Sequence, residues 1–493
     1  MSNNAAPAKK GVSAVDFFCI GFGAIVGVGW AVSINGWMTG SGGPVPAGIG
    51  YIVALIMMIP ISLCYCELVP MLPVAGGGMA FALKAFNDKI AAISGWAAFG
   101  AFVAIIPWEA IQITDILGYL FPALISGDPL YEVMGSGIYP SHLIIGTICS
   151  ILLFAVNMRG LASAAIVQKI LCFVLVGCAI IGAVASIIGG SAENWYPIYD
   201  VTNPAIYGPG LKEVTHSSMF GGIMAILATA PFFLTGFEAI PQGVEEAGGD
   251  ISSVGKTVMI SVIVACLFYA MLLFCFGYAW PWAEFAGMAR PAAATMFLYL
   301  FPGTAGTVLY WLLTLGAMAG LLTSWNGFYI AGANILMAMS RGRLMPAVFA
   351  RQNKNDAPSA ALTLCLVLSL IGPFLGANMI DSLTCFTSVG CVLSWTLTSW
   401  SLVVLRKRFP DFERPYKIPG GIGMGLFASI VSTIVLVLLF IPSSPCYAGK
   451  LSIQMFVAWM VVGIILYAAS FGQRKGMTLQ DIQDNVFAPM QEK

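Results

Sequence analysis

The chain has 493 residues, of which 59% are hydrophobic and only 9% are charged. Soluble domains carry about a quarter charged residues, so most of this surface must face something other than water. The formal net charge is zero, which implies no general attraction to nucleic acid. The first apolar run follows the N-terminus without a small-residue cleavage site, so we interpret it as a membrane span and not as a removed signal peptide.

Hydropathy, together with glycine, proline and charge breaks, predicts twelve membrane-spanning helices. They lie near residues 14–38, 45–69, 92–121, 140–157, 162–188, 219–241, 255–279, 304–331, 359–375, 380–405, 422–441 and 453–471. An even number of spans places both termini on the same side of the membrane. The predicted fold class is therefore an all-α polytopic membrane protein.

The distribution of Lys and Arg predicts on which side of the membrane the two termini lie. If both termini are cytoplasmic, only Lys212, Arg290 and Lys450 of the 22 basic residues fall in outer loops. This asymmetry is what the positive-inside rule describes. We therefore expect cytoplasmic termini, and the composition suits a bacterial inner membrane.

Two predicted spans contain residues that interrupt helices. The first span has Gly27-Val28-Gly29 near its middle, and the sixth has Pro231 followed by Gly236. Glycine inside a helix costs about 1 kcal/mol relative to alanine, and proline removes a backbone donor. A glycine seam or a proline kink would explain either span alone. Spans 1 and 6 hold corresponding positions in two five-span halves, however, and paired interruptions indicate a central transport site.

Four acidic residues lie within or at the edge of the apolar spans. We expect Glu67 and Asp115, near the ends of spans 2 and 3, to lie at the membrane interfaces. Glu109 and Glu238 are deeper, where a charged carboxylate is unfavourable unless it is paired, hydrated or protonated. Each could bind a substrate ammonium, carry a coupled proton, or form a neutral hydrogen bond between helices.

The residues that an enzyme would need are scarce. The two histidines, His142 and His216, are predicted on the outer side without metal-binding spacing. The glycine-rich stretch of span 1 follows no strand and lacks a phosphate-binding lysine. We therefore predict no enzyme activity, no cofactor, no metal and no ATP-driven step. A channel is the rival class, but it would not explain two interruptions in matching halves.

Six segments in order resemble the amino acid–polyamine–organocation superfamily of permeases. They are Gly23 to Trp30, residues 64–86, Asn157 to Gly160, Phe233 to Glu238 with Glu245 and Glu246 downstream, Ser340 to Pro346, and Arg406 to Tyr416. Two segments depart from the family pattern. Val28 stands where a small residue is usual, and the Ser340–Pro346 loop lacks the usual aspartate.

The resemblance implies a leucine-transporter-like fold, in which spans 1–5 and 6–10 form an inverted repeat. The expected organisation is a cytoplasmic tail (1–13), a transport core (14–405) with repeats 14–188 and 219–405, a basic cytoplasmic loop (406–421), spans 11 and 12 (422–471) and a cytoplasmic tail (472–493). It also implies alternating access to a site between the interrupted spans 1 and 6.

The resemblance further assigns the residues of that site. Amides of the first break would hold a substrate carboxylate, at Val26, Gly27, Val28 and Gly29. Free N–H groups at a half-helix N-terminus do attract anions. Carbonyls of the second break, at Phe232, Phe233 and Thr235, would hold an ammonium group. Phe232 would be an aromatic gate, and the small residues Ala24 and Gly27 would leave room for a side chain.

The coupling ion and the exact substrate stay open at this point. The resemblance implies a possible sodium site at Thr323 and Ser324, where sodium-coupled relatives present hydroxyl ligands, although small residues also serve simple helix packing. The lysine that replaces sodium in some relatives would lie near Leu175 and is absent here. Proton coupling through Glu109 or Glu238, sodium coupling and exchange all remain. The predicted substrate is a small amino acid, or a cationic amine or polyamine if Glu109 faces the cavity. The sequence does not specify the oligomeric state.

Overall fold

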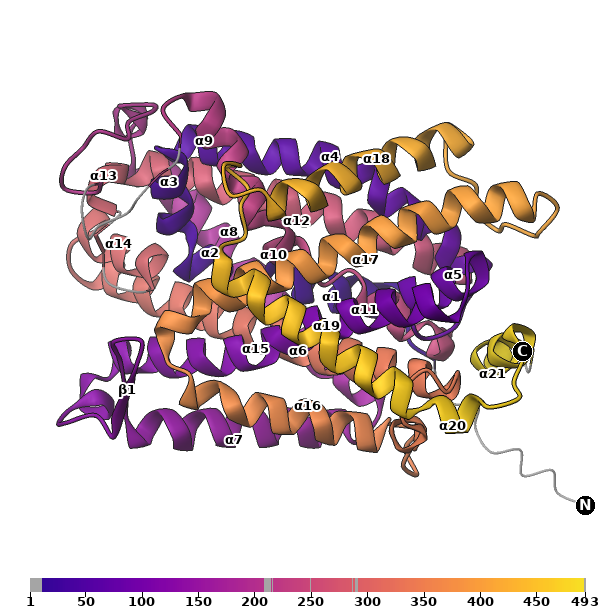
Figure 1. Cartoon of the computed structure of the whole chain (residues 1–493). Helices are drawn as coiled ribbons and strands as arrows, with labels where there is room; N and C mark the ends of the chain where they lie inside the picture. The colour runs from indigo at the N-terminus through magenta and orange to yellow at the C-terminus, as the bar shows by residue number, and fades with distance from the viewer. Residues whose placement is uncertain are drawn as a thin grey trace, which may run out of the picture.

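The computed structural model describes residues 11–207, 214, 216–248, 250–285, 287–288 and 291–491. These residues form a helical bundle with one small antiparallel hairpin (Figure 1). Ten helical segments of the described chain are long and apolar enough to cross a membrane. The chain is therefore a multi-pass membrane protein. The other two predicted spans, 219–241 and 359–375, coincide with the shorter apolar helices at 219–228 and 359–374.

The elements have the following bounds. The long helices are α1 (Ala14–Val26), α4 (Pro44–Met71), α6 (Asp88–Leu120), α7 (Pro140–Asn157), α8 (Leu161–Gly189), α12 (Ile251–Ala279), α15 (Thr304–Arg341), α16 (Ser359–Ile371), α17 (Ile380–Arg408), α18 (Gly421–Phe440) and α19 (Lys450–Ala469). The short helices are α2 (Gly29–Val32), α3 (Ile34–Ser41), α5 (Gly78–Ala85), α9 (Met219–Ala225), α10 (Ala230–Leu234), α11 (Ala239–Gln242), α13 (Trp282–Phe285), α14 (Ala292–Leu300), α20 (Phe471–Arg474) and α21 (Leu479–Gln491). The 3₁₀ turns are η1 (Pro122–Ile125), η2 (Ala192–Trp195), η3 (Ile226–Ala228), η4 (Val244–Glu246), η5 (Ala347–Ala350), η6 (Gly372–Phe374) and η7 (Ala377–Met379), and the strands are β1 (Tyr131–Val133) and β2 (Ser136–Ile138).

Side-chain caps set where several long helices begin. Ser13 and Asp16 form a reciprocal capping box at the start of α1, with N···O distances of 3.3 and 3.1 Å. Asn87 accepts a hydrogen bond from the N–H of Ile90 at the start of α6, and Asp250 caps α12 in the same way. Such caps satisfy backbone donors that the first turn of a helix leaves free.

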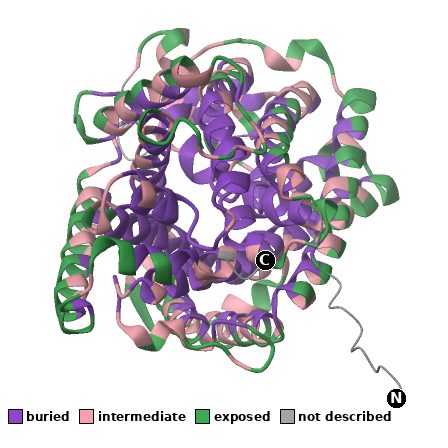
Figure 2. Cartoon of the chain, turned by 90° about the vertical axis from the view of Figure 1, so that its right-hand side faces the viewer, coloured by how far each residue is buried: buried purple, intermediate pink, exposed green. Residues whose placement is uncertain are grey.

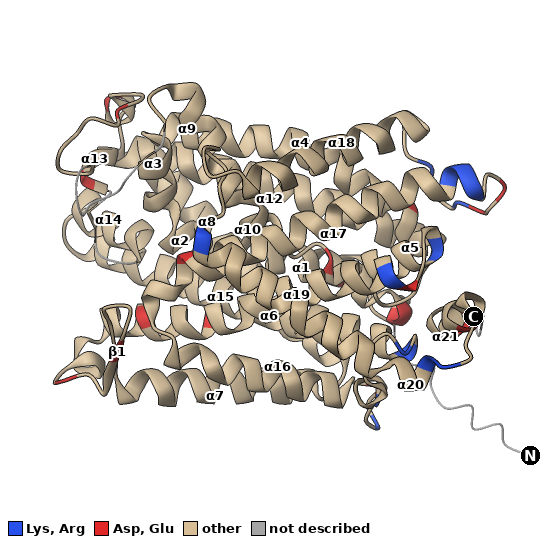
Figure 3. Ribbon diagram, in the orientation of Figure 1, with Lys and Arg blue, Asp and Glu red and all other residues tan. Residues whose placement is uncertain are grey.

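Basic side chains gather at one end of the bundle, which we call the basic end. Figure 3 shows Lys and Arg at α5, at the loop between α17 and α18, and at α20. Lys450 begins α19, and the other end of that helix leads into α20 at the basic end. This distribution is the one expected when the basic end faces the cytoplasm.

The central layer is built around α1. Helices α8, α12 and α15 pack against it, while α4 packs along α12 and α17 along α6. Figure 2, which views the molecule from the basic end, shows the buried residues concentrated in these inner helices. The outer helices α7, α18 and α19 expose large apolar side chains to the surroundings, as helices that contact lipid must. The fold therefore surrounds α1 with protein on every side.

Candidate functional site

The first predicted break is present in the structure. Helix α1 ends at Val26, and the chain turns at Gly27, where φ is 46° and ψ is −145°. Residues with a side chain rarely adopt a positive φ, so glycine is required for this turn. A new helix, α2, starts at Gly29 and continues into α3. Span 1 is thus two half-helices joined near the middle of the bundle.

This break leaves polar backbone groups on both sides. The N–H groups of Gly29 and Trp30 begin a new helix and have no acceptor within it. Val26 is the last residue of α1, so its own N–H lies inside that helix and not in the break. The phenol of Tyr269, on α12, donates to the carbonyls of Ile25 and Val26 at 2.9 and 2.7 Å. The sequence did not indicate Tyr269, because nothing distinguishes it from other aromatic residues of an apolar span.

The second break lies between α10 and α11. Helix α10 ends at Leu234, and Gly236 has φ 134°. The N–H of Thr235 still bonds to the carbonyls of Pro231 and Phe232, at 3.0 and 3.2 Å. Among the described residues, none donates a hydrogen bond to the carbonyls of Phe233 or Thr235. Two of the three predicted carbonyls are therefore open, whereas that of Phe232 is already engaged.

The two breaks lie against each other. A side chain on Gly236 would meet the backbone of Ala24 and Ile25 at 2.6 Å. A side chain on Gly29 would meet the ring of Phe233 at the same distance. The structure thus brings together the two segments that the sequence singled out, although more than 200 residues separate them. Ala24, which the resemblance assigned to the site as a small residue, lies between Gly236 and Gly327.

Glu109 lies beside the first break. It belongs to α6, and the hydroxyl of Ser324, on α15, donates a hydrogen bond to its Oε1. Its Oε2 is buried and has no hydrogen-bond partner among the described residues. A Cβ on Gly27 would lie 3.9 Å from Oε1 of this carboxylate and 2.9 Å from the Ser324 hydroxyl. Glu109 therefore offers one uncommitted oxygen next to the turn at Gly27.

Glu238 has a different role. Its Oε2 accepts the N–H of Gly236 at 2.8 Å, and its Oε1 accepts the indole N–H of Trp395, on α17. The Trp395 ring stacks on Phe237 with centroids 5.7 Å apart. Both carboxylate oxygens are thus occupied by the protein, and the side chain fastens the second break to α17.

Thr323 and Ser324 both bond to their own helix. The Thr323 hydroxyl donates to the carbonyl of Gly320 at 2.7 Å, and Ser324 also contacts the carbonyls of Gly320 and Leu321. Such bonds to the preceding turn are common where hydroxyl side chains pack between helices. Both residues lie next to α1, since Thr323 borders Gly23 and Ser324 borders Gly27.

A cavity of about 490 Å³ lies above the breaks, on the side away from the basic end. It is lined by parts of α3, α6, η3 and α17 and by residues 445–447. Its polar lining includes Asp381, His216 and Gln112, and the aromatic side chains of Trp37, Trp108 and Phe233 also line it.

Four aromatic rings separate this cavity from the breaks. Phe233 meets Trp37 edge to face at 4.7 Å, and Phe232 packs on Trp108 at 5.1 Å. Phe232 and Phe233 also contact each other at 4.8 Å. Phe233, and not the predicted gate residue Phe232, is the one that borders the cavity. The tryptophans were missed because single aromatic residues in apolar spans carry no pattern.

Backbone and ionic contacts close the basic end. The N–H of Val12 bonds to the carbonyl of Glu246 at 2.9 Å, which ties the start of α1 to the end of the second broken span. Glu245 pairs with Arg341 at 2.7 Å and accepts the N–H of Ala75 at 2.8 Å. The segment between α4 and α5 is thereby held against η4 and α15. These contacts close the basic end of the bundle, whereas the cavity lies toward the opposite end.

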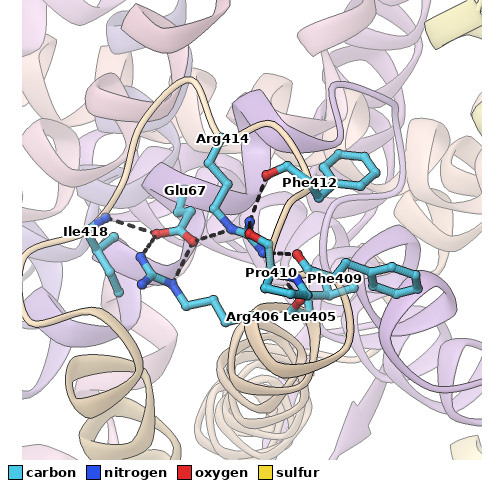
Figure 4. Close-up of polar contacts among 8 residues, drawn as sticks. All are labelled: Glu67, Leu405, Arg406, Phe409, Pro410, Phe412, Arg414 and Ile418. Atoms are coloured by element: carbon cyan, nitrogen blue, oxygen red, sulfur yellow. Dashed lines mark hydrogen bonds and ion pairs between the residues drawn. The ribbon is translucent and has the colours of Figure 1, made fainter.

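A buried ion cluster fixes the loop between α17 and α18 (Figure 4). Glu67, at the end of α4, is fully buried and pairs with Arg406 at 2.5 Å and with Arg414 at 3.2 Å. It also accepts the N–H of Ile418 at 2.9 Å. Arg414 donates to four carbonyls of the loop, from Leu405 to Phe412. Glu67 was predicted to lie at the membrane interface; in the structure its carboxylate is enclosed by protein.

A bundle of membrane-spanning helices with two facing breaks at the inner end of a one-sided cavity defines a membrane transport protein and not an enzyme. The sequence profile described as Amino acid permease matches residues 12–467. The chain therefore belongs to the amino acid permease family, within the superfamily that its motifs resemble.

Individual relatives are distant but cover nearly the whole chain. It is 24% identical over 479 residues to the branched-chain amino acid permease BcaP of Bacillus subtilis, covering 93% of this chain and 92% of that protein. The methylthioribose transporter of B. subtilis is 21% identical, with 92% of each chain covered. The aspartate-proton symporter of the same organism is 24% identical, with 95% and 92% covered.

Proposed function

We propose that this protein is a secondary active transporter that moves a small amino acid across the cytoplasmic membrane by alternating access. The observation that carries the proposal is the packing of the second break against the first, with Gly236 against Ala24 and Ile25 and Phe233 against Gly29, next to a cavity that Phe233 lines. Unsatisfied backbone groups persist inside a membrane only where they are buried in protein or line a cavity.

The two breaks are chemically matched to a zwitterion. The free N–H groups at the start of α2 carry the positive end of a helix dipole and suit a carboxylate. The open carbonyls of Phe233 and Thr235 suit an ammonium group. The predicted substrate contacts at Val28 and Gly29 fit this scheme. The N–H of Gly27 bonds to the carbonyl of Gly23 at 3.4 Å, and the carbonyl of Val26 accepts the Tyr269 phenol, so these two groups are already engaged.

The closed basic end and the open opposite end fit an outward-facing state, with the basic end in the cytoplasm. Release of substrate to the cytoplasm would then require the Glu245–Arg341 pair and the Val12–Glu246 contact to separate. Twelve spans arranged as two inverted five-span repeats plus two outer helices would supply the moving and fixed parts. The two breaks at equivalent positions of the halves support that arrangement.

A cationic amine is the alternative substrate class. Its support is Glu109, whose Oε1 lies near the Cβ position of Gly27 and whose Oε2 is buried and lacks a partner among the described residues. An ammonium group could pair with that oxygen without displacing Ser324. The relatives do not decide the class, because their names specify branched-chain amino acids, methylthioribose and aspartate.

For the coupling ion we favour the proton over sodium. The hydroxyls of Thr323 and Ser324 donate their hydrogens to their own helix and to Glu109, which leaves their oxygen lone pairs available to a cation, so the preference for the proton rests on Glu109 itself. The uncommitted carboxylate oxygen of Glu109 is a group that can accept a proton, and one relative is named as a proton symporter.

Counterflow uptake in proteoliposomes tests both points. We expect saturable exchange of small neutral amino acids from a panel that also contains acidic and basic amino acids, polyamines and ethanolamine. Net uptake should respond to a pH gradient and not to a sodium gradient. Exchange of amines alone would overturn the amino-acid proposal, and ion currents far above carrier turnover would indicate a channel.

A further inference from the structure

The helices α6 and α19 leave a groove on the outside of the bundle, near the basic end. Its α6 wall is formed by Lys89, Ala92, Ile93 and Trp96. Its α19 wall is formed by Met460, Gly463, Ile464 and Tyr467. Both sets follow the spacing i, i+3, i+4, i+7, so each is one continuous face of a helix. The space enclosed between the two faces is about 220 Å³.

A pair of tryptophans closes the deep end of this groove. Trp96 and Trp459 stack with centroids 4.5 Å apart and planes within 7°. Each indole N–H donates to the other residue's carbonyl, at 2.7 and 3.1 Å. A side chain on Gly100 or on Gly463 would meet the facing indole at 2.2 Å. The helices are therefore pinned together here and separate toward the basic end, where the small residue Ala92 leaves the space unfilled.

The groove opens toward lipid. Ile93 is 42% exposed and Ile464 is 63% exposed, on spans whose outer surface contacts the hydrocarbon of the bilayer. Almost the whole lining is apolar, and Lys89 is its only charged residue. The molecules that reach an apolar groove at this depth are lipid acyl chains.

The mouth of the groove carries net positive charge. Lys89 is exposed and forms no ion pair with any other residue that the structure describes. The Arg474 guanidinium lies over the Tyr467 ring at 3.7 Å. The hydroxyl of Tyr467 donates to the carboxylate of Asp88, which supplies the one negative charge at this mouth. Lys89 is the exposed cation of this mouth, and the buried Arg474, which donates to the carbonyls of Arg343 and Tyr467, adds a second positive charge against the one negative charge of Asp88.

We propose that this groove binds an anionic phospholipid, with its phosphate on Lys89 and one acyl chain along Ala92 and Gly463 up to the tryptophan pair. Basic groups between membrane helices on the cytoplasmic side attract anionic headgroups in this way. The site is separate from the helix breaks, so the proposal does not depend on which substrate is carried.

Thermal unfolding of the purified full-length protein in neutral detergent tests the site. Dioleoyl phosphatidylglycerol should raise the unfolding midpoint more than dioleoyl phosphatidylcholine, which has the same chains but no net charge. Lys89→Gln should weaken the apparent affinity for phosphatidylglycerol about fivefold, whereas Lys89→Arg should retain it. Lys407→Gln, a change at an exposed basic residue outside the groove, is the matched control and should leave the affinity unchanged.

A second variant tests the acyl-chain part. Ala92→Phe fills the groove and should abolish the difference between the two lipids, and Ile464→Trp should do the same from the lipid side if Ala92→Phe does not fold. Native mass spectrometry should detect one retained phosphatidylglycerol on the wild type and none on the filled variants. Equal shifts for both lipids, equal affinity in Lys89→Gln, or a lipid-free dimer in the mass spectrum would each overturn the proposal.

Discussion

The hydroxyl of Ser324 donates a hydrogen bond to Oε1 of Glu109, and this pair lies against the turn at Gly27. Ser324 belongs to α15 and Glu109 to α6, and the two residues are 215 positions apart in the sequence. Their meeting places a carboxylate with one uncommitted oxygen beside the backbone that we propose binds substrate. The first prediction concerns this carboxylate.

Glu109→Gln should separate the two substrate classes. Removing the negative charge should lower counterflow of a cationic amine about 10–100-fold, because hydrogen bonds to charged groups contribute roughly 1.5–3 kcal/mol. Exchange of neutral amino acids should change little, since backbone groups hold both of their charges. Asp381→Asn, which alters a carboxylate near the cavity mouth, is the control and should leave both uptakes intact. Uptake of neutral amino acids driven by a pH gradient should be lost in Glu109→Gln, because Glu109 is the proposed proton acceptor, and loss of their exchange as well would show that the carboxylate is also needed to bind neutral substrates.

Gly236→Ala should impair the contact between the breaks. A positive φ disfavours any side chain by about 1–3 kcal/mol, and here the added Cβ would also meet the backbone of α1 at 2.6 Å. We expect a lower unfolding temperature and loss of counterflow. Gly36→Ala is the matched control, because nothing lies within 4 Å of its Cβ position. Normal transport by Gly236→Ala would contradict the role assigned to this turn.

Tyr269→Phe should weaken substrate binding without unfolding the protein. The phenol orients the last two carbonyls of α1, and a hydrogen bond of this kind contributes about 1 kcal/mol, or about fivefold in affinity. The expected result is a raised KM with little change in the maximal rate. Tyr51→Phe removes a buried hydroxyl that has no hydrogen-bond partner among the described residues, on a ring 5.0 Å from that of Tyr269. It should behave like the wild type, and equal effects of the two changes would count against a positioning role for Tyr269.

Glu67→Gln should destabilise the protein strongly. Breaking a buried ion pair leaves Arg406 and Arg414 without their counter-charge and typically costs about 3–5 kcal/mol. The thermal unfolding midpoint in detergent measures this effect, with the exposed Glu132→Gln as control. If both variants unfold at the same temperature, the buried ion cluster in Figure 4 does not stabilise the protein as its geometry indicates.

Much of the architecture could be predicted because its causes are local. Apolar runs of bilayer length predict spans wherever they occur, and the ten long helices coincide with ten predicted spans to within a few residues, apart from the ten-residue extension of α15. Gly27 and Gly236 interrupt their helices because a missing side chain permits a positive φ. The family likewise followed from short motifs. The helices α13, α14 and α21 were not predicted, since they lie in segments too short or too polar to signal a span.

The sequence by itself therefore determined that this is a multi-pass membrane protein, and where its two spans break. Only the tertiary structure decided what surrounds the breaks. It placed Glu109 beside Gly27, committed both oxygens of Glu238 to Gly236 and Trp395, and brought the Tyr269 phenol to the end of α1. The physical reason is the distance along the sequence over which each kind of interaction acts. Helix formation and interruption depend on neighbours a few residues away, whereas a side chain's partners depend on which helices pack together and at what rotation.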